Sequence, residues 1–249
     1  MLELYHAEPG ANSLRVLIVL KEKGIDFVSH YVNLLLFEQH APEFVAVNPN
    51  GQVPVLVHDG EVITQSAVIG EYLDDVFHDV PLRPHDSAQR ARMRIWTKFC
   101  DEYFNSAVSM LGWHGMVRRI ARRIDKDRLE EVLSRIPLKE QRDKWATVAG
   151  ESFSEEELAE SRRKIGVSVA RMEDILSGSE WLAGPTYSLA DINTLGIAGY
   201  IPRMLPEVMN AGDTPHCMRW IEQMNARPGV QAALAMPNKL EETFKALGV

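Results

Sequence analysis

Residues 48–73 read NPNGQVPVLVHDGEVITQSAVIGEYL and predict a turn, a β-hairpin and then a helix. Residues 53–58 are rich in β-branched side chains, and Asp59-Gly60 is a strong signal for a tight hairpin turn before a short return strand. After Gln65-Ser66, apolar residues recur at helical spacing. The stretch therefore predicts an antiparallel sheet edge that leads directly into a helix.

Two features of this stretch indicate a binding site. Pro54 cannot donate to a sheet ladder, so it belongs at a strand start or an edge, in a peptide bond that is compatible with the cis form. The backbone of Val53 is then free to pair with an extended peptide. Ser66 places a hydroxyl and free backbone N–H groups at a helix start, which suits a carboxylate. Each feature alone also fits an edge strand or an ordinary N-cap, but the pair around one hairpin favours peptide recognition.

At these residues the sequence resembles the glutathione transferase family, in which a Val-Pro and a Glu-Ser or Gln-Ser flank this same hairpin. Here they stand as Val53-Pro54 and Gln65-Ser66. The resemblance implies a thioredoxin-like α/β N-terminal domain followed by an all-α C-terminal domain. It also implies glutathione as co-substrate and a homodimer.

The order of the other N-terminal elements agrees with that fold. The patterns predict strands at residues 2–5 and 27–32 and helices at residues 14–23 and 42–47, before the hairpin and its helix. The first strand–helix–strand unit requires a parallel crossover, and the hairpin adds the antiparallel edge. We assign residues 1–80 to this glutathione-binding domain.

Residues 81–87 are a linker by composition, and after them the strand signals end. Residues 88–249 are predicted to form an all-helical domain with the second-substrate pocket. Its first helix covers residues 88–123, with a bend expected at Gly112 and Gly115. Further along the chain, Pro137 predicts a break between helices, and Ser154 with Glu157 and Ser188 with Asp191 predict two capping boxes. A helix is expected at residues 214–226, a turn at NARPGV (residues 225–230), and a short last helix after that turn.

Ser13 is the candidate catalytic residue. It follows a Gly-containing loop and precedes the predicted helix at residues 14–23, so we expect it at a helix N-terminus, where partial positive charge stabilises an anion. A hydroxyl that donates to a sulfur atom would lower the thiol pKa further. By resemblance, Ser13 holds the glutathione sulfur, Asn12 shares the contact or sets the loop, and Tyr5 is the alternative.

The resemblance also assigns the two ends of glutathione. Gln39, His40 and Gln52 are expected to bind the glycine end, because amide and imidazole N–H groups suit a carboxylate. Ser66 is expected to hold the γ-glutamyl carboxylate, and Gln65 to lie by the ammonium. No set of side chains has metal-ligand spacing.

Motifs along nearly the whole chain are similar to those of one subgroup, the bacterial β-etherases that cleave lignin-derived aryl ethers. They are GANSL, FEQH, NPNGQVP, YLDDVF, RMRIWTKFCDEYF, IGVSVARME, YSLADI and NARPGV. The subgroup usually has an acidic residue where this chain has Gln65. The resemblance implies a thiolate that displaces an aryl-oxide from the β-carbon of an ether ketone. The alternatives are a transferase for other electrophiles and a non-catalytic glutathione-fold binding protein, while Ser13 in place of cysteine argues against thioether cleavage.

The second-substrate pocket is expected along the first helix of the helical domain. Aromatic side chains at helical spacing also fit a core, but an aromatic wall suits a flat apolar ligand. In the family this helix faces the sulfur across a cleft. The expected wall is Tyr103, Ser106, Met110, Trp113 and His114, with Met204 or Tyr200 on the far side.

Composition narrows the class of protein. The chain has 249 residues, a net charge of −8 and two cysteines, which argue against nucleic-acid binding, a disulfide framework and a zinc site. The arginines at residues 118–123 alternate with nearby acidic residues, as on a solvated helix face. The longest apolar run, residues 16–20, is too short for a bilayer, and no signal peptide is evident. We therefore expect a cytoplasmic protein that does not bind a membrane.

Overall fold

The computed structural model describes residues 1–247, and its N-terminal half contains a four-stranded sheet in the order β2-β1-β3-β4. Strand β1 (Leu2–His6) pairs parallel with β2 (Val28–Tyr31) and antiparallel with β3 (Val55–His58), and β3 pairs antiparallel with β4 (Glu61–Thr64). The predicted parallel crossover and the antiparallel hairpin are therefore confirmed. Strand β3 starts two residues later than expected, beyond Pro54, which has no N–H for the ladder.

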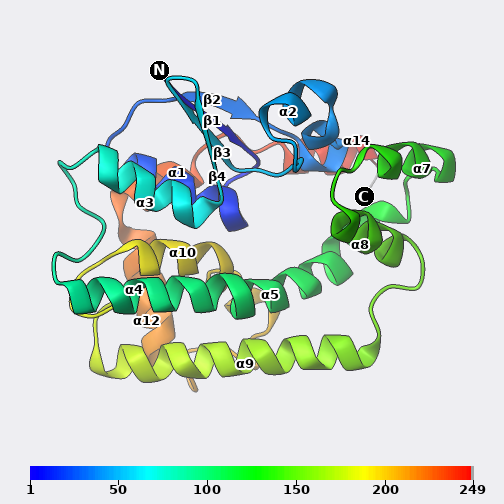
Figure 1. Ribbon diagram of the computed structural model, residues 1–249. Helices are drawn as coiled ribbons and strands as arrows, with labels where there is room; N and C mark the ends of the chain where they lie inside the picture. Colours follow the sequence, from blue (N-terminus) through cyan, green and yellow to red (C-terminus); the bar gives the residue numbers. More distant parts are fainter. Residues whose placement is uncertain (248–249) are drawn as a thin grey trace.

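Helices cover the two faces of this sheet (Figure 1). Helices α1 (Ala11–Glu22) and α3 (Ser66–Val76) share one hydrophobic core with Leu4 of β1. Helix α2 (Pro42–Val47) lies on the other face, where its Phe44 contacts Tyr5 of β1. The alternation along β1 follows from the two-residue period of a strand.

The helical half opens with one continuous helical stretch, as predicted. It contains two wide π-helical turns, and Gly115 lies in the second of them. The parts of this stretch are α4 (Ser87–Phe99), η3 (Cys100–Phe104), α5 (Asn105–Gly112), η4 (Trp113–Val117) and α6 (Arg118–Ala121).

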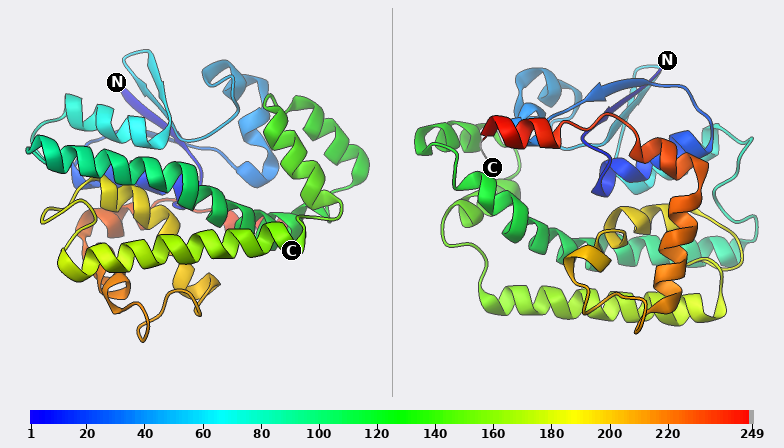
Figure 2. Two further views of the ribbon diagram at one scale, coloured as in Figure 1. Left: turned by 60° about the horizontal axis from the view of Figure 1, so that its bottom comes forward. Right: turned by 180° about the vertical axis from the view of Figure 1, so that it is seen from behind.

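The remaining helices complete the domain, and Figure 2 shows them from two further sides. Both predicted capping boxes are confirmed: Glu157 N–H donates to Ser154 Oγ at 3.2 Å, and Ser188 N–H donates to Asp191 Oδ2 at 3.0 Å. These helices are α7 (Lys126–Arg135), α8 (Lys139–Ala149), α9 (Glu155–Gly178), α10 (Leu189–Ala198), α11 (Ile201–Met204), α12 (Pro215–Ala226), α13 (Pro228–Leu234) and α14 (Leu240–Leu247).

The NARPGV stretch is not simply the expected turn. Helix α13 begins at Pro228, because the first position of a helix needs no N–H and suits the fixed φ of proline. Arg227 precedes it and forms two hydrogen bonds of 2.8 Å to Glu22 at the end of α1. This segment therefore ties the C-terminal helices to the N-terminal half.

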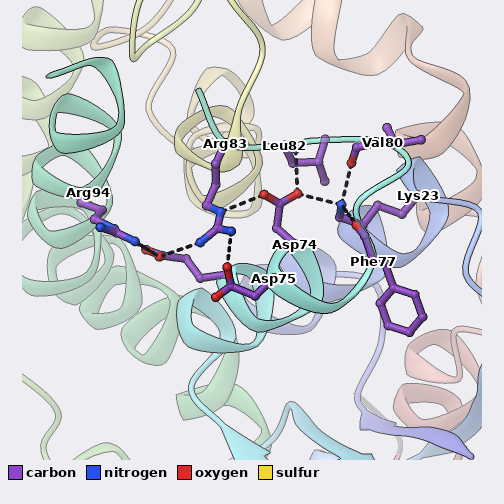
Figure 3. Close-up of polar contacts among 9 residues, drawn as sticks. Lys23, Asp74, Asp75, Phe77, Val80, Leu82, Arg83 and Arg94 are labelled. Carbon is purple, nitrogen blue, oxygen red and sulfur yellow. Dashed lines mark hydrogen bonds and ion pairs between the residues drawn. The ribbon is translucent and has the colours of Figure 1, made fainter. Parts of the chain in front are cut away.

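Asp74 of α3 anchors the connection between the two halves (Figure 3). Its carboxylate lies 2.7 Å from Lys23 Nζ and 2.8 Å from Arg83 Nε, and it accepts the Leu82 N–H at 2.8 Å. Burial alone would raise the pKa of Asp74, but hydrogen bonds from Lys23, Leu82 and Arg83 hold it below the usual value. These contacts fix the chain between α3 and α4.

Helix α10 packs directly beneath α1 (Figure 1). A Cβ atom on Gly196 of α10 would lie 2.4 Å from the carbonyl oxygen of Ala11, so only glycine allows this approach. The amino end of α1 is therefore positioned by the helical domain. Among the described residues, no helix combines the length and apolarity needed to cross a bilayer.

Candidate active site

Ser13 lies in the first turn of α1, and its place differs from the expected one. The helix begins at Ala11 after an extended Gly10, so Ser13 is its third residue and does not cap it. The side chain is buried, and its Oγ accepts a hydrogen bond of 3.1 Å from the Ala7 N–H. The predicted helix start at residue 14 was wrong. The prediction relied on apolar residues, which begin at Leu14, whereas the first turn of the helix consists of Ala11, Asn12 and Ser13.

Asn12 lies beside Ser13 at the positive end of this helix. Its Oδ1 atom is buried and has no hydrogen-bond partner among the described residues. The first turn contains no acidic residue, and its leading N–H groups have no acceptor within the helix. An amide oxygen can only accept, so Asn12 Oδ1 requires a ligand that donates to it, whereas an anion would bind the free N–H groups of the first turn. The arrangement can hold an anion at the end of α1.

His6 fixes the loop that holds Ser13, and sequence reasoning missed it. Its Nδ1 lies 2.6 Å from the Ala7 carbonyl oxygen, and its Nε2 lies 2.7 Å from Ser29 Oγ. Burial lowers the pKa of His6, so the ring is neutral at neutral pH. Because a carbonyl can only accept, Nδ1 carries the proton and Ser29 donates to Nε2. The sequence signal for this role was the position of His6 at the end of the predicted first strand, where a titratable side chain becomes buried.

Tyr5, the alternative sulfur ligand, has different neighbours. Its ring stacks on His30 with centroids 4.4 Å apart and meets Phe44 edge-on at 5.9 Å. It therefore belongs to the face of the sheet that carries α2, whereas Ser13 belongs to α1 on the opposite face. This placement favours Ser13 over Tyr5 as the sulfur ligand.

Val53 and Ser66 lie at the edge of the same surface. The Val53-Pro54 peptide bond is cis, and pairing between β1 and β3 starts at Val55, so Val53 precedes the ladder. Gln65 is exposed with a φ of 69°, and Ser66 is the first residue of α3. Continuing the register from the Tyr5–Val55 pair brings Val53 beside Ala7, which contacts Ser13.

Arg15 links Ser13's helix to Ser66. Its Nη1 donates to Ser66 Oγ at 3.3 Å and to Asp101 Oδ1 at 2.5 Å, while Nε and Nη2 are buried and have no partner within residues 1–247. The side chain is almost fully buried. Sequence reasoning missed this arginine, although a single cation inside the apolar run at residues 14–20 was a usable signal. Its positive charge makes the Ser66 end of the site suitable for a carboxylate.

Gln39 and His40 supply more unpaired polar atoms. Gln39 Oε1 and both ring nitrogens of His40 are buried and have no partner among the described residues. Burial lowers the pKa of His40 to about 4, so the ring is neutral near pH 7. A Cβ atom on Gly51 would lie 2.6 Å from His40 Nδ1, which places His40 directly against the turn before Gln52.

Comparison with known proteins identifies the family. The model of the glutathione S-transferase N-terminal domain matches residues 10–76, and that of the C-terminal domain matches residues 108–228. Protein LigF of Sphingobium sp. strain SYK-6 is 44% identical over 236 residues, covering 92% of this chain and 91% of LigF. The chain belongs to the glutathione S-transferase family.

Solved structures agree with this assignment. The crystal structure of the β-etherase LigF from the same strain has a TM-score of 0.91 at 43% identity, covering 95% of this transferase and 99% of LigF. Glutathione transferase F7 from Populus trichocarpa has a TM-score of 0.71 at 26% identity, with 95% and 100% covered. Glutathione S-transferase 3 of Zea mays is 28% identical over 94% of this chain and 93% of its own length. The predicted two-part transferase fold is thus confirmed.

The five residues predicted for the second-substrate wall of this transferase contact different neighbours, and the wall itself stays a prediction. Tyr103 stacks on Phe99 at 5.3 Å and lies 5.6 Å from Lys164 of α9. Ser106 donates to the carbonyl groups of Glu102 and Tyr103 in its own helix. Met110 Sδ accepts a hydrogen bond from Ser161 of α9. Trp113 packs on Trp145 of α8, and His114 Nδ1 lies 2.9 Å from Ser152 Oγ.

Tyr200 contacts the loop that leads into α1. Its hydroxyl donates to the Pro9 carbonyl at 3.5 Å and would lie 3.4 Å from a Cβ atom on Gly10, the residue before α1. The residue is 48% exposed, and burial of the phenol together with the Glu8 carboxylate raises its pKa. Met204 instead packs against the main core. Tyr200 is therefore a protonated hydrogen-bond donor next to the residues that precede α1.

Proposed function

We propose that this transferase is a glutathione-dependent β-etherase. Its thiolate would displace the aryl-oxide from the β-carbon of a lignin-derived β-aryl ether ketone, giving a glutathione thioether and a phenol. The observation that carries the proposal is the likeness to the β-etherase LigF, at 44% identity over 92% of the chain. The amino end of α1, which carries Asn12 and Ser13 and can hold an anion, supports the same chemistry.

The placement of the polar side chains supports one orientation of glutathione. The γ-glutamyl carboxylate would bind Ser66, which Arg15 contacts, and the γ-glutamyl ammonium would lie by Gln65. The cysteinyl backbone would pair with Val53 beside the Pro54 bond. The glycine carboxylate would accept hydrogen bonds from the side-chain N–H groups of Gln39 and Gln52 and from a ring N–H of His40. The His40 ring is the buried group among these three that would gain the donor contact it lacks among the described residues.

This orientation carries the sulfur to the amino end of α1. The partial positive charge there, with donors from Asn12 and Ser13, lowers the thiol pKa from its usual value of about 8.5. Because Ser13 Oγ accepts from Ala7, the hydroxyl proton remains available for the sulfur. The protein thus stabilises a thiolate at neutral pH and aligns it with the second substrate.

The displacement itself exchanges one bond for another. The thiolate attacks the β-carbon from the side opposite the aryl-oxygen, so a C–S bond forms as the C–O bond breaks. The adjacent ketone makes this carbon electrophilic. The leaving phenolate has a conjugate-acid pKa of about 10, so a hydrogen bond from Tyr200 and a proton from solvent suffice to accommodate it.

We also propose that the enzyme is a cytoplasmic homodimer. The thiols of Cys100 and Cys217 are buried and form no disulfide, which fits a reducing compartment. Val68 of α3 and Ile95 of α4 are 55% and 60% exposed and offer apolar contacts to a second copy. Sedimentation of the wild type and of a Val68→Glu variant tests this assembly.

The test of the function is incubation with glutathione and a racemic β-aryl ether ketone. We expect phenol release that stops near half conversion if one enantiomer fits, with the other enantiomer left. Chlorodinitrobenzene is assayed beside it. Turnover of chlorodinitrobenzene alone would make the protein a transferase for other electrophiles, and turnover of neither, with glutathione still bound, would make it a binding protein.

A further inference from the structure

Gln39 and His40 belong to a short loop, residues 33–40, whose supports lie far away in the sequence. Asn33 organises this 33–40 loop from within. Its Oδ1 accepts the N–H groups of Leu35 and Leu36 at 3.1 and 3.3 Å, and its own N–H donates to Glu38 Oε2 at 2.7 Å. The side chain of Asn33 therefore caps the 3₁₀ turn η1 (Leu34–Leu36), and its backbone N–H holds Glu38 at the start of the 3₁₀ turn η2 (Glu38–His40).

The last helix of the chain holds Asn33. The Asn33 Nδ2 atom donates to Thr243 Oγ1 of α14 at 2.8 Å, and both residues are buried. Lys239, just before α14, lies 5.5 Å from the ring of Tyr31 at the end of β2. Because Asn33 Oδ1 is occupied by the loop, Thr243 is the group that fixes the remaining end of the amide.

Helix α8 holds the loop from a second side. Phe37 has a φ of 62°, a conformation that side chains with a Cβ rarely adopt and that surrounding contacts must maintain. Its ring is buried 4.7 Å from that of Trp145, in a cluster with Ala121, Val132, Ile136 and Val148. Helices α7, α8 and α14 lie at the same end of the molecule (Figures 1 and 2).

These two supports meet at His40. The ring of Phe37 lies 6.5 Å from that of His40, and the bare backbone of Gly51 closes the opposite side. Both nitrogens of His40 lack partners among the described residues, so no hydrogen bond orients the ring. Packing alone sets where its N–H points, and the helical domain supports one side of that packing through Phe37 and Trp145.

We propose that Asn33 and Phe37 are positioning residues for the glycine end of glutathione, held by Thr243 of α14 and Trp145 of α8. This inference rests on the glutathione orientation proposed above. Loss of either support would let Gln39 and His40 leave the carboxylate while the γ-glutamyl and sulfur ends keep their partners. The helical domain would thus take part in co-substrate recognition as well as in binding the second substrate.

The test compares two ligands by calorimetry: glutathione and γ-glutamylcysteine, which lacks the glycine. In Thr243→Val we expect the Kd of glutathione to rise about 3- to 10-fold, the effect of losing one buried hydrogen bond, and that of γ-glutamylcysteine to stay unchanged. Thr243→Ser keeps the hydroxyl and should bind as the wild type does. Thr214→Val, at another buried threonine, is the matched control. Phe37→Leu provides a second variant with the same expected selectivity.

The outcomes separate the two proposals. Equal weakening of both ligands in Thr243→Val and Phe37→Leu, or no weakening of either, would overturn the positioning role. A wild type that binds glutathione no more tightly than γ-glutamylcysteine would overturn it too. A wild type that shows the ligand selectivity but releases no phenol from an ether would overturn only the proposed etherase activity.

Discussion

The Ala7 N–H donates to Ser13 Oγ at 3.1 Å, so the hydroxyl of Ser13 is oriented by the end of strand β1. The oxygen is occupied as an acceptor, and its proton can point toward the space at the amino end of α1. The residue that precedes Ala7, His6, is itself fixed by Ser29 on β2. The position of this hydroxyl is thus set by the sheet as well as by the helix.

Ser13→Ala should therefore reduce the rate only in part. We expect about a 10-fold fall in kcat/KM and a rise of about one unit in the pKa of the bound thiol, which is the value of one hydrogen bond to a charged atom. The thiolate is titrated by its ultraviolet absorbance in the binary complex. Ser134→Ala, whose hydroxyl bonds only its own helix on the surface, is the control.

Complete loss of activity in Ser13→Ala would mean that the helix end and Asn12 cannot hold the thiolate without the hydroxyl. No change in either the rate or the thiol pKa would move the sulfur contact to Asn12.

His40 should make glutathione binding depend on pH. Burial holds its pKa at about 4 in the free enzyme, and a bound carboxylate would raise that pKa toward its usual value of about 6.5. Binding then takes up a proton, so the affinity rises as pH falls within this window. Between about pH 7.5 and about pH 5.5 we expect the Kd to fall by up to about 10-fold.

His40→Gln is the matching variant, because it keeps an N–H donor but does not titrate in this range. Its Kd should be nearly flat across the same interval. An identical pH dependence in the wild type and the variant would show that His40 does not face the carboxylate.

Asp74→Asn should destabilise the fold strongly. The change leaves Lys23 and Arg83 without their shared carboxylate in a buried place, which costs about 3 kcal/mol or more. Asp75→Asn is the control, because Asp75 also pairs with Arg83 but is 64% exposed, and we expect a loss of less than about 1 kcal/mol. Urea denaturation near pH 7 measures both.

The same carboxylate predicts the direction of acid sensitivity. Because the pKa of Asp74 is lowered in the folded state, its stabilisation is present above its unfolded pKa of about 3.9 and is lost as pH falls through the folded value. The stability difference between the wild type and Asp74→Asn should therefore shrink below about pH 4. A difference that stays constant there would contradict the ion-pair interpretation.

Tyr200→Phe should change how the rate depends on the leaving group. The hydroxyl lies by Gly10 at the amino end of α1, and its one proton forms a long hydrogen bond of 3.5 Å to the Pro9 carbonyl. We expect it to exchange that bond for one to the departing aryl-oxygen. Poor leaving groups, with phenol pKa values near 10, should slow by about 10-fold, and nitrophenolate leaving groups should hardly slow. Tyr72→Phe, which removes a hydroxyl bonded to His58, is the control. A uniform loss across all leaving groups would point to a structural role.

Much of the backbone around the proposed glutathione site could be predicted from local patterns. Asp59-Gly60 fixes the hairpin, Pro54 ends the ladder and Ser66 begins a helix, and each of these is decided within a few residues. The capping boxes at Ser154 and Ser188 were equally local. Such features are readable because the chemistry and the backbone geometry come from neighbours in the sequence.

The features that were missed depend on contacts between distant segments. The role of Arg15 could not be predicted because its partners, Asp101 and Ser66, are distant from it in the sequence. Phe37 takes a strained backbone only because α8 offers a place for its ring. The second-substrate wall stays a prediction, since helical spacing does not say which side of a helix a neighbour such as α9 will cover.

The most direct test of the central claim is a single turnover with enantiopure β-aryl ether ketone and one equivalent of glutathione. If the thiolate at the amino end of α1 attacks from behind the aryl-oxygen, each released phenol is matched by one glutathione thioether with inverted configuration at the β-carbon. Phenol release without the thioether, or a thioether that keeps the original configuration, would contradict the account.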